Sequence, residues 1–153
     1  DELPSEPGDA RQVVMCSGKV YYDLFEERKR RGVTDVHILR LEQLYPFPSD
    51  ALSKLLAPYQ HCDFVWCQEE PRNMGAWTFV CEFIEELLDE MGFAHPDLRY
   101  AGRSAAASPA TGRAEHHERE QMALIDEALA VGLSPVGRIG SRKARVRKSQ
   151  KPS

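Results

Sequence analysis

The sequence lacks several features that would each point to a particular class of protein. It contains no run of about 18 consecutive apolar residues, so we expect no transmembrane helix. Its first residues, DELPSEPGDARQ, are acidic and proline-rich and include no apolar segment, which gives no sign of a secretory signal peptide. The chain does not begin with Met, and we expect it to be either processed or a piece of a longer protein.

Cysteine is scarce, and its spacing excludes the common cysteine motifs. The four cysteines among 153 residues form no CxxC pair, which argues against a zinc ribbon and a thioredoxin-like centre. Cys16, Cys67 and Cys81 lie in apolar surroundings. We therefore expect buried, reduced thiols of an intracellular protein, and no metal site.

The chain has no overall excess of basic residues, but its charge is unevenly distributed. Residues 137–153 hold seven Lys or Arg and no acid; removing these from the net charge of −4 leaves −11 for residues 1–136. An acidic body argues against nucleic acid as a partner. The polar, basic segment 133–153 is predicted to be a disordered tail. It is either a solvated extension or an electrostatic tether to an acidic partner surface or to nucleic acid.

The hydrophobic pattern alternates between strands and helices. Strands are predicted at 12–18, 35–44, 63–68 and 98–103, and helices at 19–32, 49–59, 75–93 and 114–132. Connections of helix length imply parallel pairing. We predict an α/β fold, an open and mostly parallel sheet with helices on both faces. Residues 1–11 are predicted to be a linker and residues 12–132 the domain.

Residue spacing also predicts details of the helices. Glu26 and Arg30 should pair at i,i+4, Gly32 should end the first helix, and Ser49 should cap the second. Two helices have clear apolar stripes that we expect to be buried. These stripes are Phe79, Phe83, Ile84, Leu87 and Leu88 in one helix, and Met122, Ile125 and Leu129 in the last.

In an open parallel sheet, ligands bind beyond the carboxyl ends of the strands. The sequence CSGK follows the first strand, and Ser17, Gly18 and Lys19 could hold an anion at the start of a helix. The motif is neither GxGxxG nor a P-loop. A plain tight turn is the alternative interpretation.

The strand end with the most side chains that could take part in chemistry is the sequence FVWCQEEPRNMGAW at 64–77, which holds a thiol, an amide and two carboxylates. A catalytic thiol needs a lowered pKa and a nearby base, whereas the acids next to Cys67 would raise its pKa. Glu69 and Glu70 are adjacent on an extended chain and point to opposite sides, so they cannot easily serve one substrate. We assign no catalytic residue. The small residues of SPATG at 108–112 would allow close approach of a ligand or, as we favour, of another chain.

Four blocks occur in a familiar order: VVMCSGKVYYDLFEERK, LRLEQLYPFP, FVWCQEEPRNMGAW and RYAGRSAAASPATG. Together they closely resemble the C-terminal domain of the first component of the 2-oxoglutarate dehydrogenase complex, a thiamine diphosphate enzyme of the transketolase type. The resemblance covers roughly residues 12–129. It implies a mostly parallel α/β domain that completes the subunit and helps to form the homodimer.

The resemblance also implies a reaction and its partners. The complete enzyme decarboxylates 2-oxoglutarate in the tricarboxylic acid cycle and passes a succinyl group to the lipoyl arm of the succinyltransferase component. The family's thiamine diphosphate and magnesium are held by other domains, on a motif of the type GDG…N. The GDA at 8–10 matches that motif only in part. We therefore expect this chain to bind neither group and to be inactive alone.

The remaining domains of the same enzyme and a second subunit are the implied contacts. The residues assigned to these contacts are Glu69, Glu70, Asn73, Gly75, Trp77, Ser108, Pro109 and Gly112. The alternative is a stand-alone interaction or effector-binding module derived from this domain. The expected location is the bacterial cytoplasm, with the mitochondrial matrix as the alternative.

Overall fold

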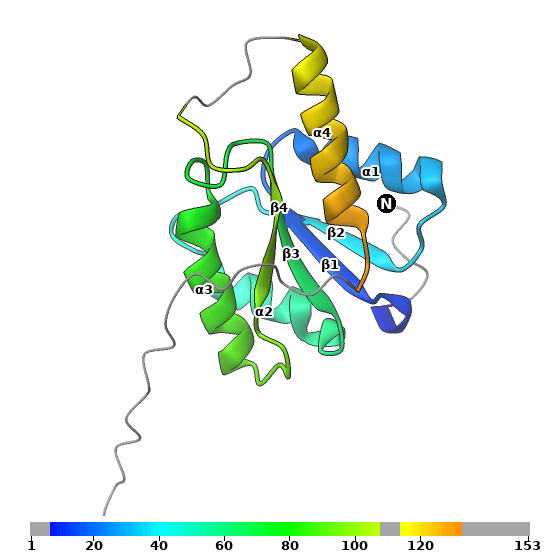
Figure 1. Cartoon of the computed structure of the whole chain (residues 1–153). Coiled ribbons are helices and arrows are strands. Elements are labelled where there is room, and N and C mark those ends of the chain that lie inside the picture. The colour runs from blue at the N-terminus through cyan, green and yellow to red at the C-terminus, as the bar shows by residue number, and fades with distance from the viewer. Residues whose placement is uncertain (1–6, 108–113, 133–153) are drawn as a thin grey trace, which may run out of the picture.

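A computed structural model describes residues 7–107 and 114–132, and in these residues four strands form one parallel sheet. The strands are β1 (Gln12–Cys16), β2 (Val36–Arg40), β3 (Asp63–Gln68) and β4 (Leu98–Gly102). Their order is β2-β1-β3-β4, and each neighbouring pair is parallel (Figure 1). The predicted parallel α/β sheet is therefore confirmed, with strands up to five residues shorter than expected.

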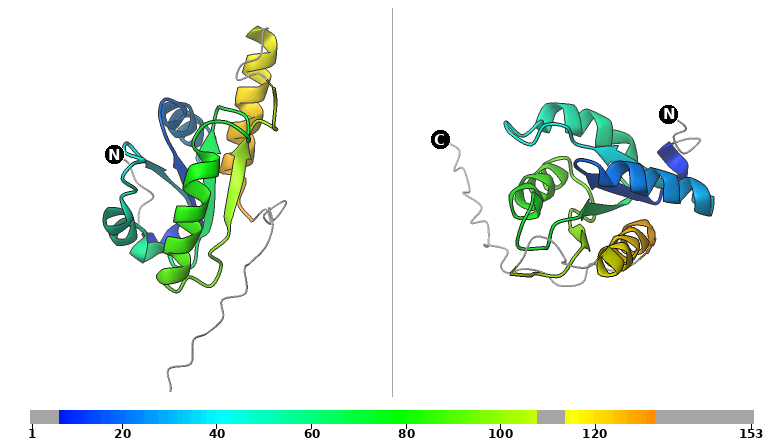
Figure 2. Two further views of the ribbon diagram at one scale, coloured as in Figure 1. Left: turned by 90° about the vertical axis from the view of Figure 1, so that its left-hand side faces the viewer. Right: turned by 90° about the horizontal axis from the view of Figure 1, so that it is seen from above.

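Helices cover both faces of this sheet, as predicted. They are α1 (Val20–Arg31), α2 (Ser49–Leu56), α3 (Trp77–Glu90) and α4 (Ala114–Leu129). Short 3-10 turns span Pro7–Asp9 and Ala57–Tyr59. Helices α1 and α4 pack on one face, and α2 and α3 pack on the other (Figure 2). None of the described helices is long and apolar enough to cross a membrane.

The central strands are buried on both sides, which explains their continuous apolar sequences. All five residues of β1 are buried. Val13 and Met15 belong to the core beneath α2 and α3, whereas Val14 and Cys16 belong to the core beneath α1 and α4. Alternation along the strand thus supplies two separate hydrophobic layers.

In α3 the buried stripe differs from the prediction. Trp77, Val80, Ile84, Leu87 and Leu88 are buried, at the three- and four-residue spacing of one helix face. Phe79 and Phe83, which were predicted to be buried, are 37% and 40% exposed. Successive residues turn about 100° around a helix, so these two rings lie beside the stripe and not within it.

Three further predictions about the helices were wrong. Arg30 pairs with Glu27 and not with Glu26, and Glu27 also contacts Arg31. Ser49 is the first residue of α2, and the capping position is Pro48 without a side-chain cap. Met122 is 43% exposed, because the core side of α4 is formed by Leu124, Ile125, Ala128 and Leu129.

Among the thiols, Cys16, Cys62 and Cys67 are buried and Cys81 is half-buried, and all four are free. Cys62 is buried although its sequence neighbours are polar, because it packs in the core beneath α2 and α3. Its thiol donates a hydrogen bond to the carbonyl of Ala10 at 3.0 Å. The expected burial of Cys81 is therefore only partly met.

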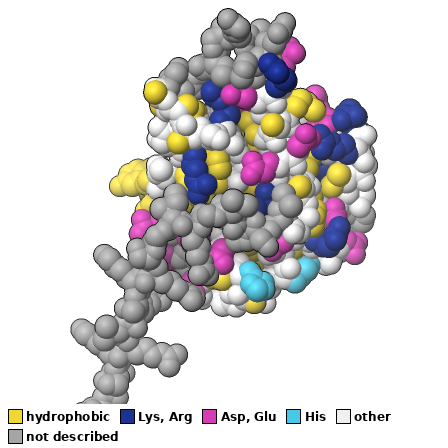
Figure 3. All heavy atoms as spheres, viewed as in Figure 1, with side chains coloured by type: hydrophobic (Ala, Val, Ile, Leu, Met, Phe, Trp, Pro, Cys, Tyr) yellow, Lys and Arg dark blue, Asp and Glu magenta, His cyan; other side chains and the backbone are white. Residues whose placement is uncertain are grey.

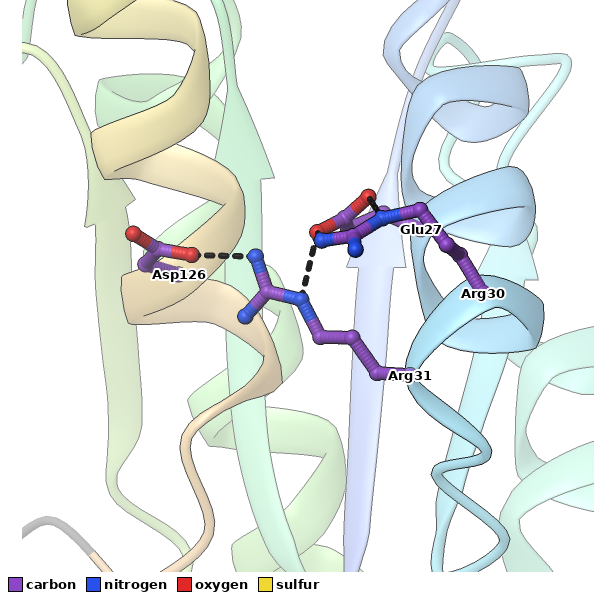
Figure 4. Close-up of polar contacts among 4 residues, drawn as sticks. All are labelled: Glu27, Arg30, Arg31 and Asp126. Atoms are coloured by element: carbon purple, nitrogen blue, oxygen red, sulfur yellow. Dashed lines mark hydrogen bonds and ion pairs between the residues drawn. The ribbon is translucent and has the colours of Figure 1, made fainter.

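An ion-pair network joins α1 to α4. The guanidinium of Arg31 lies between two carboxylates, contacting Glu27 at 2.5 Å and also Asp126 of α4 (Figure 4). Arg30 contacts Glu27 as well. Hydrogen bonds from Arg30 and Arg31 lower the pKa of Glu27 to about 2. The network therefore ties the first helix to the last through charge.

A buried polar network lies at the amino end of the sheet. The Gln12 side-chain amide donates to the carbonyl of Ala128 at 2.6 Å, and its oxygen accepts from Arg99 at 3.1 Å. Arg99 also donates to the carbonyls of Glu127 and Ala130, at 2.8 and 3.0 Å. The last carbonyls of a helix lack hydrogen-bond donors within the helix. Here the side chains of Gln12 in β1 and Arg99 in β4 are the donors.

Candidate functional site

The carboxyl ends of the strands converge on a surface formed by residues 17–19, 68–77 and 102–107, which we call the carboxyl edge. From β1 the chain continues to β2, on one side of β1 in the sheet. From β3, on the other side of β1, it continues to β4, which lies still further away in that opposite direction. The sheet therefore has a topological switch point between β1 and β3, the usual position of a ligand site in such folds.

Gln68, the last residue of β3, organises the carboxyl edge. Its side-chain oxygen accepts hydrogen bonds from the Trp66 indole at 3.0 Å and from the Trp77 backbone at 2.9 Å. Its nitrogen lies 3.2 Å from the carbonyls of Glu70 and Pro71 and 2.8 Å from that of Met74. One buried amide thus holds the whole loop to the start of α3.

Gly75 allows the loop to close on Gln68. Its φ of +66° is a left-handed conformation that favours glycine. A Cβ atom there would lie 3.0 Å from both the Gln68 side-chain nitrogen and the Glu70 carboxylate. The predicted importance of Gly75 therefore has a structural basis within the chain, independent of any partner.

Tyr100 and Arg72 join the β3 loop to the end of β4. The Tyr100 hydroxyl lies 3.1 Å from the carbonyl of Glu70 and 2.9 Å from that of Arg103. The Arg72 guanidinium lies over the rings of Trp77 and Tyr100, 5.6 and 5.3 Å from their centroids. Cations over aromatic faces are attracted electrostatically, so Arg72 closes the edge from outside.

Asn73 connects the two long loops directly. Its amide nitrogen donates to the carbonyl of Ala106, and its amide oxygen accepts from the Ala106 backbone, each at 3.0 Å. This pair of hydrogen bonds imitates the pairing of two backbones. It fixes the start of the loop that leads toward Ser108, Pro109 and Gly112, which themselves lie outside the described residues.

The predicted anion site at Ser17, Gly18 and Lys19 lies at the switch point. There the Lys19 ammonium is bound by the Glu69 carboxylate at 2.5 Å, which raises the pKa of Lys19. An incoming anion would have to compete with Glu69. Lys19 lies at the capping position of α1, and its own side chain makes no capping hydrogen bond.

The buried thiols at this edge are unsuited to nucleophilic chemistry. Cys16 and Cys67 are opposite each other in β1 and β3. Burial raises the pKa of Cys16 to about 12 and raises that of Cys67 well above its ordinary value. Because the thiolate is the reactive form, both groups behave as core side chains.

The structure places the residues assigned to domain and subunit contacts in two different environments. Glu70, Asn73 and Gly75 are exposed on one loop, and Glu69 is partly covered by its contact with Lys19. Trp77 is only 6% exposed, so its ring supports the loop from within the core and presents little surface. Gln68, the residue on which the loop depends, was not assigned a role from sequence. Its partners are mostly backbone atoms, which leave no pattern in a sequence.

The carboxyl edge holds no apparent metal site. Among the described residues, no group of three or more His, Cys, Asp or Glu side chains is arranged to hold a metal ion. The glycine and aspartate of GDA lie in the 3-10 turn before β1, at the opposite end of the sheet. These residues do not form a site for a diphosphate and its magnesium.

Comparison with known sequences assigns the chain to a family. The sequence model described as 2-oxoglutarate dehydrogenase C-terminal matches residues 1–129. The chain belongs to this family. It is 55% identical over 119 residues to the proteins named 2-oxoglutarate dehydrogenase E1 component from Brucella anthropi, Brucella ovis and Brucella canis.

The match to each of these relatives covers 78% of this chain but only 12% of the relative. The chain therefore spans about one eighth of the length of the curated relatives that it matches. The family resemblance inferred from the four sequence blocks is confirmed.

Proposed function

We propose that this chain serves as the C-terminal domain of a thiamine diphosphate-dependent 2-oxoglutarate dehydrogenase. Its task is to present the carboxyl edge to the other domains and to a second subunit. The complete enzyme decarboxylates 2-oxoglutarate and passes a succinyl group to the lipoyl group of a succinyltransferase component, a step of the tricarboxylic acid cycle. We place the enzyme in the bacterial cytoplasm.

The observation that carries this proposal is the construction of the carboxyl edge. The side-chain nitrogen and oxygen of Gln68 both form hydrogen bonds within the loop and to the start of α3. Tyr100 and Asn73 form hydrogen bonds to backbone groups. Such an edge is rigid, while its thiols are buried and Lys19 is engaged by Glu69. A rigid, chemically quiet surface suits packing against other protein better than it suits catalysis.

Thiamine diphosphate and magnesium belong, in this proposal, to the other domains of the enzyme. The described residues do not fit them, so the chain's own contribution is to hold those domains in place. Small errors in positioning reacting groups are costly in enzymes, and a domain without catalytic residues can therefore affect the rate.

A chimera tests the proposal. This chain replaces the matching segment of the Brucella anthropi enzyme, and the chimera is assayed for 2-oxoglutarate decarboxylation with thiamine diphosphate and magnesium. We expect an active chimera and no turnover by the isolated chain. Turnover by the isolated chain, or a correctly folded chimera that is inactive, would contradict the proposal.

A charge reversal within the chimera tests the role of the edge. Glu70→Lys places a cation on the exposed part of the loop, where like or unpaired charges in an interface cost several kcal/mol. We expect subunit association to weaken by at least about tenfold, which corresponds to about 1.4 kcal/mol. The kcat of the assembled enzyme should stay within about twofold.

Asp9→Lys is the matched control, because it reverses an exposed acid in the 3-10 turn before β1, at the opposite end of the sheet from the carboxyl edge. Association is measured by sedimentation equilibrium. Equal association of both variants would show that the edge is not the interface.

A further inference from the structure

Within the described part of the chain, the outward side of α3 is an exposed face that combines aromatic rings with acids. Phe79, Phe83, Glu86 and Glu90 follow one another at three- and four-residue spacing, and Glu82 lies three residues after Phe79 and four before Glu86. All five are exposed. We call these five residues the α3 outer face. The buried stripe of the same helix faces the sheet, so this second stripe has no role in the described core.

The aromatic part of this face extends beyond the helix. Phe83 stacks on Phe47 with ring centroids 5.1 Å apart and lies 5.0 Å from Phe79. Tyr45, in the same β2–α2 connection as Phe47, is 83% exposed. Hydrophobic side chains project at the left edge of Figure 3, at the level of this connection and the upper part of α3 in Figure 1. Exposed aromatic rings that contact each other, as Phe79 and Phe83 do, are typical of binding surfaces.

The charge of α3 has one sign only. The helix contains five acids, Glu82, Glu85, Glu86, Asp89 and Glu90, and no Lys or Arg. None of the ion pairs found among the described residues involves Glu82, Glu86 or Glu90. Like charges at i,i+4 destabilise a helix by a few tenths of a kcal/mol, and a basic partner would remove that cost.

The basic tail, residues 133–153, has the complementary composition. Its cations are Arg138, Arg142, Lys143, Arg145, Arg147, Lys148 and Lys151; it has no acid, and Ile139 and Val146 lie among them. The tail follows α4, whose carboxyl end lies at the same end of the sheet as that of α3 (Figure 1). Six extended residues span about 20 Å, so the cations beyond Gly132 can reach around the sheet.

From this charge complementarity we propose that the basic tail binds the α3 outer face of its own chain. Lys and Arg side chains of 138–151 lie against Glu82, Glu86 and Glu90, while their alkyl stems and the apolar tail residues cover Phe79 and Phe83. The carboxyl end of α3 is the negative end of the helix dipole, and the last turn of α3 contains no basic residue. This negative end adds to the attraction for the basic tail.

Backbone amide shifts of the full 153-residue chain provide the test, by comparison with a chain ending at Val136. We expect differences concentrated in 79–90 that are large at low salt. They should disappear between about 10 mM and about 1 M salt, over which the Debye length falls from about 30 Å to about 3 Å. Absent differences, or differences spread evenly over the domain, would overturn the proposal.

Charge reversal gives the matched comparison. Glu86→Lys with Glu90→Lys should abolish the tail-dependent shifts, whereas Glu26→Lys with Glu118→Lys, on α1 and α4, changes the net charge equally and should preserve them. Reversing Arg145, Arg147 and Lys148 to Glu leaves the domain untouched and should act like tail deletion. If the control pair abolishes the shifts as well, attraction is not specific to α3 and the proposal fails.

Dilution distinguishes the tail's own chain from a second copy. An intramolecular contact is independent of protein concentration. If the α3 shifts fade on dilution of the full chain, the tail binds another molecule, and the proposed contact within one chain is wrong.

Discussion

Two buried glutamines lie at opposite ends of the sheet, and they stabilise different things. Gln12, at the start of β1, works with Arg99 to bind the last carbonyls of α4, so it fixes a helix to the core. Gln68, at the end of β3, binds a loop that has little regular structure of its own. The same side-chain amide thus secures architecture at one end and surface shape at the other.

The difference lies in what surrounds each amide. Gln12 is completely buried and its partner Arg99 is 6% exposed, so water cannot replace a lost hydrogen bond there. Around Gln68 the loop residues Glu70, Asn73 and Gly75 are exposed. We infer that damage at the amino end affects the whole domain, whereas damage at the carboxyl edge is confined to the loop.

The largest effect is expected from Arg99→Met. This change leaves the Gln12 oxygen and the carbonyls of Glu127 and Ala130 without their donor inside the protein. We expect a loss of about 3 kcal/mol in the free energy of unfolding, measured by urea denaturation. A loss below about 0.5 kcal/mol, the range of ordinary surface substitutions, would show that this network is not structural.

A smaller global effect is expected from Gln68→Leu, about 2 kcal/mol, because water can reach part of the released loop. Locally the effect should be larger, with faster hydrogen exchange of the Trp77 amide and of the 69–76 backbone. In the chimeric enzyme, association should weaken although the domain stays folded.

Combining Gln68→Leu with Arg99→Met sharpens the comparison. Distant sites without shared partners usually add within about 0.5 kcal/mol. Combining Gln12→Leu with Arg99→Met should deviate from additivity, because these two side chains share a hydrogen bond. Strong coupling between the two ends of the sheet would contradict the separation of roles.

The smallest expected effect is on the stability of the domain at low pH, through Glu27. The pKa of Glu27 is lowered to about 2 from an ordinary value of 4.5, so ionised Glu27 favours the folded state above pH 4.5. That stability is lost as pH falls from about 5 to about 2, where Glu27 becomes protonated in the folded state as well. Glu27→Gln should remove this part of the pH dependence of Tm and leave the exchange rates of the 69–76 loop unchanged.

Much of the fold could be predicted from sequence because strands and helices leave periodic patterns. The two-sided burial of β1 and β3 produced continuous apolar runs, and the helix-length connections implied parallel pairing. The misplaced Phe79 and Phe83 show the limit of this reasoning. Two apolar stripes lie side by side on α3, and only the tertiary structure decides that the stripe through Val80 and Ile84 is the buried one.

The carboxyl edge was harder to predict than the sheet. The loop's exposed acids and its glycine attracted attention, and their position beyond a strand followed from topology. Gln68, Tyr100 and Arg72 did not stand out, because they act on backbone carbonyls and ring faces that any sequence offers. Arg99 and Gln12 were missed for the same reason.

The hydrogen bond from Gln12 to Ala128 joins residues 116 positions apart in the chain. During synthesis on a ribosome, β1 emerges before the other strands and helices of this domain. The Gln12 amide can form its hydrogen bond only after the end of α4 has been synthesised. Contacts so distant in sequence slow folding, since the intervening chain must be ordered first. The nascent domain therefore keeps its first strand incompletely satisfied until almost all of the described fold has left the exit tunnel.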